Sequence, residues 1–240
     1  MPDLYSGGAQ RVVMNLVKGF DRKLFDITLA ILIKPNNNHF SKLLSTDIRI
    51  VQFNYSKTSH SALALLSLIK KEKPNVVFST LTHLNFILGI IKFFVSSKIS
   101  FVARESSIIS WSIKDEKFPQ LFRFFYGWVY KNLDLVICQS KAMADDLEQN
   151  FKLDRSSLRI IYNPVDLESI SNNLSNNKDS KPDKDQIKFL CVGRLYPVKG
   201  YDRLLKMLAM VTNLDFKLKI IGDGPLREEL QELSAQLEVN

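Results

Sequence analysis

Cysteine and histidine are scarce in this 240-residue chain, which has two of the former and three of the latter. Cys138 and Cys191 lie far apart, each inside an apolar run of strand length. They therefore provide no disulfide framework or zinc site, and we expect both to be reduced core residues. The histidines have no metal-ligand spacing and accompany no nucleophile motif, so zinc and hydrolase chemistry have no support.

Long hydrophobic runs are also missing. No apolar stretch reaches the roughly 18 residues that a membrane span needs, and the best candidate, residues 86–95, is interrupted by Lys92. No signal peptide opens the chain, so the sequence predicts a cytoplasmic protein. Glycine and proline number only 9 and 8 while 45% of the residues are hydrophobic, a composition typical of globular domains.

Acidic residues are few in the first half of the chain. Residues 1–131 carry 18 Lys and Arg against 8 Asp and Glu, within a net charge of +8 for the whole chain. Such an excess suits an anionic partner, for example the inner face of a membrane; a general enrichment in lysine explains it equally well. The chain has no RNA-binding motif and no recognition-helix signature, so no nucleic-acid partner is expected.

Apolar runs of strand length alternate with stretches of helical periodicity along the first 170 residues. The predicted strands are 25–33, 48–53, 76–78, 99–103, 135–138 and 158–161, and the clearest helices are 62–69, 83–94, 121–133 and 143–147. Ser140 is suited to cap the last of these helices. The alternation predicts an α/β fold with a parallel sheet covered by helices on both faces.

Residues 171–186 contain one apolar residue in sixteen, which predicts a polar linker between two domains, 1–170 and 187–240. The alternation then restarts with strands 187–192 and 216–221 and helices 201–211 and 226–237. Asp183 and Asp185 have the D-x-D spacing of a metal-binding pair of carboxylates, but they lie in the linker and not at a strand end. We therefore expect no metal site.

Both predicted domains lack expected parts. A doubly wound domain opens with a central strand before its glycine-rich turn, yet only six residues precede Gly7. The second domain has two strand–helix units, and Val239 and Asn240 begin what should be a third strand. We expect two Rossmann-like domains, the first without its opening strand and the second half present.

Three loops have the composition of phosphate-binding turns. Gly7 and Gly8 precede a helical pattern, where free amides and the positive dipole end attract anions; an ordinary tight turn is the alternative. Residues 193–200, GRLYPVKG, and 222–225, GDGP, each follow a predicted parallel strand. Both loops should lie at the same sheet edge, where doubly wound folds bind ligands.

Four ordered motifs, GGAQRVVMNL, IIYNPVD, VGRLYPVKGYDRLL and IIGDGPLREEL, resemble family 4 glycosyltransferases of GT-B fold over nearly the whole chain. The resemblance implies retaining, metal-independent transfer from a nucleotide diphosphate sugar, with no cofactor. It places the donor near Gly7, Gly8, Gly193, Arg194, Lys199, Gly222, Asp223, Gly224 and Pro225. Arg194 and Lys199 would stabilise the leaving diphosphate, and Asn163 and Asp166 match the segment at the domain junction.

The sequence departs from the family pattern after the strand predicted at 99–103. Many members carry there a histidine that binds the transferred sugar, whereas this chain has Arg104 and Glu105. Both are candidate catalytic residues by resemblance to a related branch, although Glu105 is more simply interpreted as a structural partner of Arg104. The family's paired glutamates, which hold ribose and sugar, are not in the sequence.

Residues 118–131 are aromatic almost all round, with basic ends. A helix that is apolar on every side is usually buried, and we favour burial over insertion into a membrane interface.

The resemblance implies a glycosyltransferase that passes sugar to a glycan or polyprenyl-linked acceptor in cell-envelope polysaccharide synthesis. A non-catalytic remnant, or one half of a split enzyme that acts with a partner chain, is the alternative.

Overall fold

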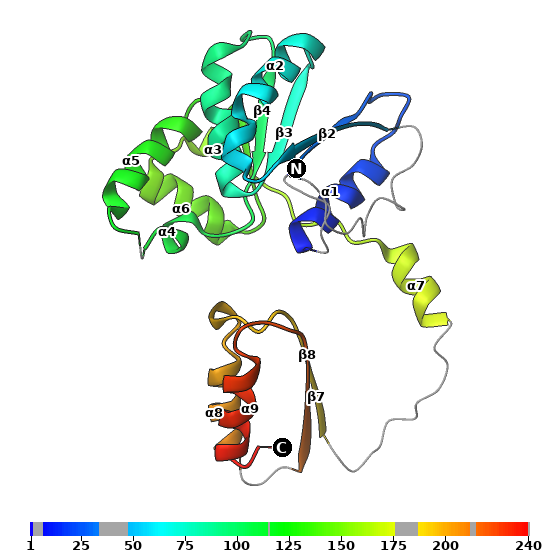
Figure 1. Cartoon of the computed structure of the whole chain (residues 1–240), viewed down its shortest axis with the longest axis vertical. Coiled ribbons are helices and arrows are strands. Elements are labelled where there is room, and N and C mark those ends of the chain that lie inside the picture. Colours follow the sequence, from blue (N-terminus) through cyan, green and yellow to red (C-terminus); the bar gives the residue numbers. More distant parts are fainter. Residues whose placement is uncertain (2–6, 34–47, 115, 176–186, 212–214, 240) are drawn as a thin grey trace. The chain divides into compact units, whose positions relative to one another are not determined.

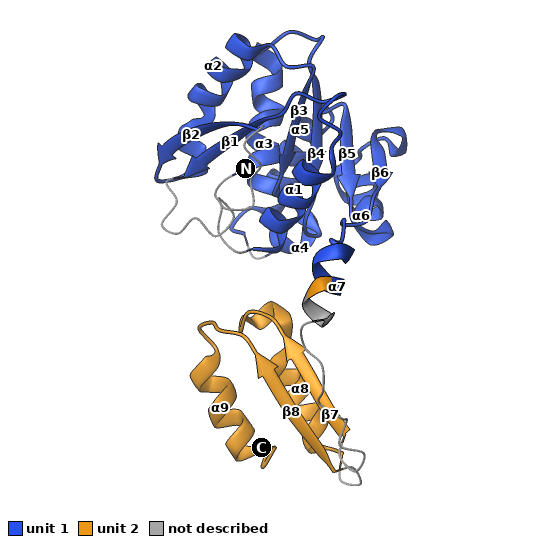
Figure 2. Cartoon of the chain, turned by 90° about the vertical axis from the view of Figure 1, so that its right-hand side faces the viewer, with its two compact units in different colours: residues 1–171 blue, residues 172–240 orange. Residues whose placement is uncertain are grey.

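The computed structural model describes residues 1, 7–33, 48–114, 116–175, 187–211 and 215–239 (Figure 1). They form two compact units, Met1–Ser171 and Asn172–Asn240 (Figure 2). Most of the predicted linker, with Asp183 and Asp185, lies outside the described residues. The linker was predicted to begin at residue 171, close to the division between the two units at Ser171, and helix α7 continues past that point to Ser175.

Unit 1 is built from parallel strands with helices packed around them. Its strands are β1 Thr28–Ile33, β2 Arg49–Tyr55, β3 Val76–Thr80, β4 Ser100–Arg104, β5 Leu135–Cys138 and β6 Leu158–Ile160. Its helices are α1 Gly8–Gly19, α2 Ala62–Glu72, α3 Thr82–Ile91, α4 Ile109–Ser112, α5 Pro119–Tyr130, α6 Lys141–Phe151 and the first part of α7 Leu167–Ser175. The short 3₁₀ helices are η2 Thr58–Ser61, η3 Lys92–Phe94 and η4 Arg155–Ser157.

The strands of unit 1 form two sheets, one with the order β1-β2 and one with the order β3-β4-β5-β6, and every pair is parallel. Among the described residues no strand joins β1 to β3, the place that the first strand of a doubly wound sheet occupies. The ammonium group of Met1 donates to the carbonyl of Ala30 at 2.7 Å, and Leu32 N–H donates to the carbonyl of Met1 at 3.2 Å. Carbonyl groups point alternately to the two sides of a strand, so both bonds lie on the side of β1 that faces away from β2.

Several local predictions are confirmed. Strand β5 has the predicted limits, and the Ser140 side chain caps α6 by accepting a hydrogen bond from Met143 N–H. Cys138 is buried and free, as expected, whereas Cys191 is only partly buried. Apolar side chains from α2, α3, α5 and α6 and from the four-stranded sheet form the main core of unit 1, and α1 packs on β1 in a smaller cluster.

The preference for burial of the aromatic segment 118–131 was wrong. Helix α5 begins at Pro119, as suits its first position, and it covers the core with Tyr126, Gly127 and Tyr130 only on one side. Its other side leaves four large apolar side chains 45–68% exposed: Leu121, Phe124, Phe125 and Trp128.

Unit 2 pairs two parallel strands, β7 Ile187–Val192 and β8 Phe216–Ile221, both with the predicted limits. The helices α8 Tyr201–Ala209 and α9 Arg227–Gln236 pack against one face, around a core that includes Leu205, Leu208 and Leu230. The helix predicted at 226–237 is α9, which begins one residue later than predicted, and Pro225 lies in the turn before it. Val239 is packed in the core without strand structure, and Asn240 lies outside the described residues.

Candidate functional site

The carboxyl ends of β3 to β6 bring a polar network together in unit 1. Arg104, at the end of β4, is 4% exposed. Its Nη1 donates to Thr80 Oγ1 at 2.9 Å, and its Nη2 donates to Asn163 Oδ1. Asn163 Nδ2 in turn donates to Gln139 Oε1 at 2.8 Å. One guanidinium therefore ties the end of β3 to the loop after β6, across the sheet edge where ligands bind in doubly wound folds.

Glu105 is fully buried beside this network. Its carboxylate accepts hydrogen bonds from Thr82 Oγ1 at 2.7 Å, from Asn85 Nδ2 at 2.6 Å and from the Tyr130 hydroxyl. Burial raises the pKa of Glu105 above the ordinary value, and the hydrogen bonds oppose that shift. Burial and the adjacent Glu105 hold the pKa of Tyr130 well above its usual value.

The interpretation of Glu105 as a direct partner of Arg104 does not hold in this structure. Among the described residues the two side chains form no ion pair, and each has its own hydrogen-bond partners. Successive side chains along an extended segment point in opposite directions, which explains the separation. Burial lowers the pKa of Arg104, and the nearby charge of Glu105 opposes this effect.

The glycine-rich turn at residues 7 and 8 is the N-terminus of α1. Gly7 is the cap residue and Gly8 is exposed, and a Cβ added at Gly8 would meet no atom within 4 Å. Helix α1 also contacts the loop that carries Asn163 and Asp166. Asn15 Nδ2 donates to the carbonyl of Pro164 at 3.2 Å, and Lys18 Nζ lies 4.0 Å from Asp166 Oδ2.

In unit 2 the two glycine-containing loops lie against each other at the carboxyl ends of β7 and β8. Gly193 N–H donates to Ile221 O at 3.0 Å and Leu195 N–H donates to Asp223 O at 2.9 Å. A Cβ at Gly222 would lie 1.8 Å from the carbonyl oxygen of Gly193, and one at Gly224 would lie 2.5 Å from that of Leu195. Glycine is required at both positions because one backbone passes directly over the other.

Arg194 and Lys199 are both exposed on the first of these loops. The guanidinium of Arg194 lies 5.0 Å from the ring centroid of Tyr196, a cation–π contact. Lys199 ends the short 3₁₀ helix η5 Pro197–Lys199, and Gly200 follows with a φ of 68°. Neither cation forms an ion pair with a described carboxylate, so both can meet an anion arriving at this edge. Asp223 accepts a hydrogen bond from Gly224 N–H and lies near Arg227.

Sequence reasoning missed the residues that hold Arg104 and Glu105 in place. Thr82 and Asn85 reach Glu105 because Leu81, with a φ of 80°, turns the chain sharply from β3 into α3. The polar stretch STLTHLN after an apolar strand was an available signal for these two residues. No sequence signal distinguished Tyr130 from its aromatic neighbours. His83, within the stretch STLTHLN, is exposed in the first turn of α3.

Two family models match this chain. The model described as Glycosyltransferase Family 4 matches residues 6–169, and the one described as Glycosyl transferases group 1 matches residues 173–240. A curated relative from Campylobacter jejuni subsp. jejuni serotype O:2, N-acetylgalactosamine-N,N'-diacetylbacillosaminyl-diphospho-undecaprenol 4-alpha-N-acetylgalactosaminyltransferase, is 29% identical over 98% of this chain and 64% of its own length. The chain thus spans just under two thirds of that relative.

Solved structures show the same GT-B fold. Anabaena Alr3699/HepE in complex with UDP matches with a TM-score of 0.71 and 17% identity, covering 99% of this chain and 65% of the other. The lipopolysaccharide outer core galactosyltransferase WaaB in its apo form matches with a TM-score of 0.66 and 19% identity, covering 99% and 63%. From the two family matches, which together include most of its residues, the chain belongs to Glycosyltransferase Family 4.

Proposed function

We propose that these 240 residues provide the acceptor domain and part of the donor domain of a glycosyltransferase. The enzyme moves a sugar from a nucleotide diphosphate sugar to a glycan or polyprenyl diphosphate-linked acceptor in cell-envelope polysaccharide synthesis. Transfer retains the anomeric configuration and needs no metal ion, as the family resemblance implies. The C. jejuni relative, whose name gives a diphospho-undecaprenol acceptor, supports this acceptor class.

The donor side of the proposal depends on the paired loops of unit 2, which are the observation that carries it. Their backbones are fixed to each other by the Leu195–Asp223 hydrogen bond, and the two exposed cations occupy the same strand end. In this assignment the Arg194 fork and the Lys199 ammonium neutralise the diphosphate as it leaves. The glycines at 193, 222 and 224, with Asp223 and Pro225, let the nucleotide approach the main chain.

On the acceptor side, the proposal places Gly7 and Gly8 of α1 near the donor phosphates, where a helix N-terminus favours an anion. Arg104 acts as a positioning residue, because its fork is engaged with Thr80 and Asn163. Glu105 is also a positioning residue, because its carboxylate is inaccessible and joins α3 to α5 through the hydrogen bonds from Thr82 and Tyr130.

A second possibility is that this chain is a non-catalytic remnant or half of a split transferase. The chain spans 64% of the curated relative's length. The paired-glutamate motif that the resemblance implies for ribose and sugar binding is not in the sequence.

A transfer assay distinguishes the two. The protein that contains these residues is incubated with a panel of UDP-, GDP- and ADP-sugars and a short polyprenyl diphosphate-linked glycan. Mass spectrometry should detect a lengthened acceptor with one of the donors, and NMR should show a retained anomeric configuration. Transfer that appears only when a second chain is added supports the split enzyme. No transfer under any of these conditions contradicts the proposal.

A further inference from the structure

Helix α5 carries an exposed apolar stripe along its outer side. The stripe follows the i, i+3, i+4, i+7 spacing of one helix face and consists of Leu121, Phe124, Phe125 and Trp128. These side chains are 45–68% exposed. None of the helices in the described part combines the length and apolarity needed to cross a bilayer. Contiguous exposed apolar side chains usually mark an interaction site.

The stripe continues onto the 3₁₀ helix η3. The ring of Phe93 stacks on Trp128, with centroids 4.9 Å apart and planes 14° apart, and Phe94 is 60% exposed. Six large apolar side chains from two elements thus form one patch, which we call the aromatic surface: Phe93, Phe94, Leu121, Phe124, Phe125 and Trp128.

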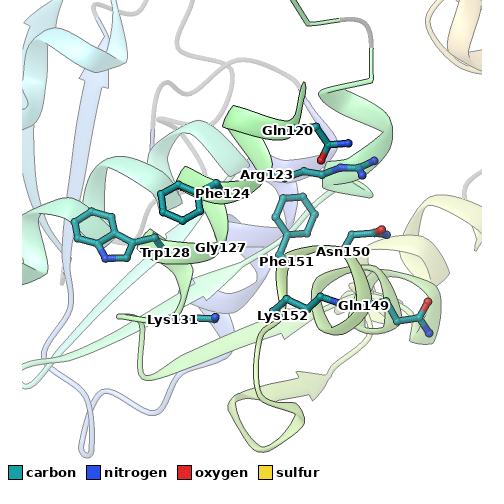
Figure 3. A pocket seen from close by; sticks show the side chains of 10 residues that line it. All are labelled: Gln120, Arg123, Phe124, Gly127, Trp128, Lys131, Gln149, Asn150, Phe151 and Lys152. Carbon is teal, nitrogen blue, oxygen red and sulfur yellow. The ribbon is translucent and has the colours of Figure 1, made fainter. Parts of the chain in front are cut away.

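A hollow of about 490 Å³ opens between α5 and the end of α6, directly beside this surface (Figure 3). Phe124 and Trp128 line one side, and Arg123, Lys131 and Lys152 supply three cations. None of the ten described residues that line the hollow is acidic. The buried Nε of Arg123 has no hydrogen-bond partner among the described residues, although a buried polar group is normally satisfied.

The hollow owes its position to a close approach of helix α5 to the end of α6. A Cβ added at Gly127 would lie 2.7 Å from the carbonyl oxygen of Phe151, so only glycine allows this distance. Lys152 then ends α6 in the left-handed conformation, with a φ of 58°. The cations are therefore presented on a fixed backbone next to the aromatic rings.

We propose that α5, η3 and the end of α6 bind the surface of a bilayer that contains anionic phospholipids. The aromatic surface enters the interfacial layer, which aromatic rings favour. Arg123, Lys131 and Lys152 contact the headgroup phosphates, and the unpartnered Arg123 Nε gains an acceptor. The charge pattern favours an anionic bilayer over a protein partner. Three cations and no carboxylate are among the described residues that line the hollow beside the apolar patch, and residues 1–131 carry 18 basic against 8 acidic residues.

Vesicle flotation of the 240-residue chain tests this proposal. Binding to vesicles of phosphatidylcholine with 30 mol% phosphatidylglycerol, roughly the charge of an anionic leaflet, should exceed binding to phosphatidylcholine alone and should weaken with salt. Equal binding of the chain to both compositions overturns the proposal. Binding of inorganic phosphate by a chain that does not bind the vesicles overturns it as well.

Matched variants locate the surface. Removing all three cations, as Arg123→Gln, Lys131→Gln and Lys152→Gln together, should weaken vesicle binding by about 100-fold, since each cation contributes roughly five-fold. Phe124→Ser with Trp128→Ser should weaken it by about ten-fold or more. The controls are Leu63→Ser, an apolar residue 80% exposed on α2, and Lys206→Gln on α8. Circular dichroism checks that each variant is folded, and controls that lose as much binding as the test variants contradict the assignment.

Tryptophan fluorescence gives an independent measurement. The chain has two tryptophans, so Trp111→Phe leaves Trp128 as the single reporter. Its emission should shift to shorter wavelength on addition of anionic vesicles and should be quenched by lipids brominated near the headgroup. An unchanged spectrum in a vesicle-bound sample overturns the role of α5. If the chain does not bind vesicles but dimerises with rising concentration, and Phe124→Ser with Trp128→Ser abolishes the dimer, the partner of this surface is a second copy of the chain instead.

Discussion

Replacing Glu105 tests whether this buried carboxylate holds the fold together. Glu105→Leu removes the acceptor for Thr82, Asn85 and Tyr130. In this variant Asn85 Nδ2 can still donate to the carbonyl of Arg104 at 3.0 Å, and the Tyr130 hydroxyl lies 3.4 Å from the carbonyl of Thr82. These two hydrogen bonds partly compensate for the lost carboxylate. With each unsatisfied buried group costing roughly 1–3 kcal/mol, Glu105→Leu should lower the free energy of unfolding by about 3 kcal/mol.

Glu105→Gln is the matched control for charge. Its carbonyl can accept from Asn85 and Tyr130, and its amide can donate to the Thr82 hydroxyl, so the variant should stay within about 1 kcal/mol of wild type. Because burial raises the folded-state pKa of Glu105, its contribution to stability is complete below the unfolded-state pKa and is lost as pH rises through the folded-state value. The free energy of unfolding of Glu105→Gln should therefore increase relative to that of wild type as pH rises.

Urea unfolding followed by circular dichroism between acidic and neutral pH measures both effects. If the stability of wild type instead rises relative to Glu105→Gln as pH increases, the pKa of Glu105 is lowered in the folded state and the reasoning is refuted. A Glu105→Leu variant as stable as wild type would show that the three hydrogen bonds contribute nothing.

Gly222→Ala and Gly224→Ala should each destabilise unit 2 by roughly 2 kcal/mol or more, because the new Cβ would lie 1.8 and 2.5 Å from backbone atoms. Gly8→Ala is the control and should not destabilise unit 1, because the space around a Cβ at Gly8 is open. Equal unfolding midpoints for the three variants would contradict this prediction. Arg104→Lys should speed amide hydrogen exchange at Asn163, Val165 and Asp166, since a lysine cannot join Thr80 to Asn163 as the guanidinium fork does. Unchanged protection of these amides would contradict that role of Arg104. Burial raises the pKa of Cys138 to about 11, so iodoacetamide at pH 8 should label Cys191 before Cys138, and early labelling of Cys138 in folded protein would be inconsistent with its burial.

The sequence predicted regular elements well where one pattern dominated. Strands β5, β7 and β8 have the predicted limits because each is a short, mainly apolar segment, interrupted only by lysines in β7 and β8, that lies between a polar residue and a polar residue or glycine. Helix α5 was assigned to the wrong environment because its apolar residues lie on all sides. Periodicity alone does not tell which apolar side the fold covers.

The candidate site divides in the same way. The loops with Arg194 and Gly224 could be predicted to share an edge because parallel strands present their carboxyl ends together, and their backbones do lie in contact. The polar stretch STLTHLN singled out Thr82 and Asn85, but the meeting of Thr82 and Tyr130 at Glu105 could not be predicted, since the two come from distant parts of the chain. Their meeting depends on the packing of α3 against α5.

The most direct test of the proposed function is turnover by variants of Arg194 and Lys199 at saturating donor. In the transferase that contains these residues, Arg194→Ala and Lys199→Ala should each lower kcat by about 10²- to 10³-fold, as loss of a positioned charge donor commonly does. Arg194→Lys should recover only part of this because the bidentate fork is lost, and Lys206→Ala on α8 should match wild type. Rates within about threefold of wild type for both alanine variants would contradict the assignment of these cations to the leaving diphosphate.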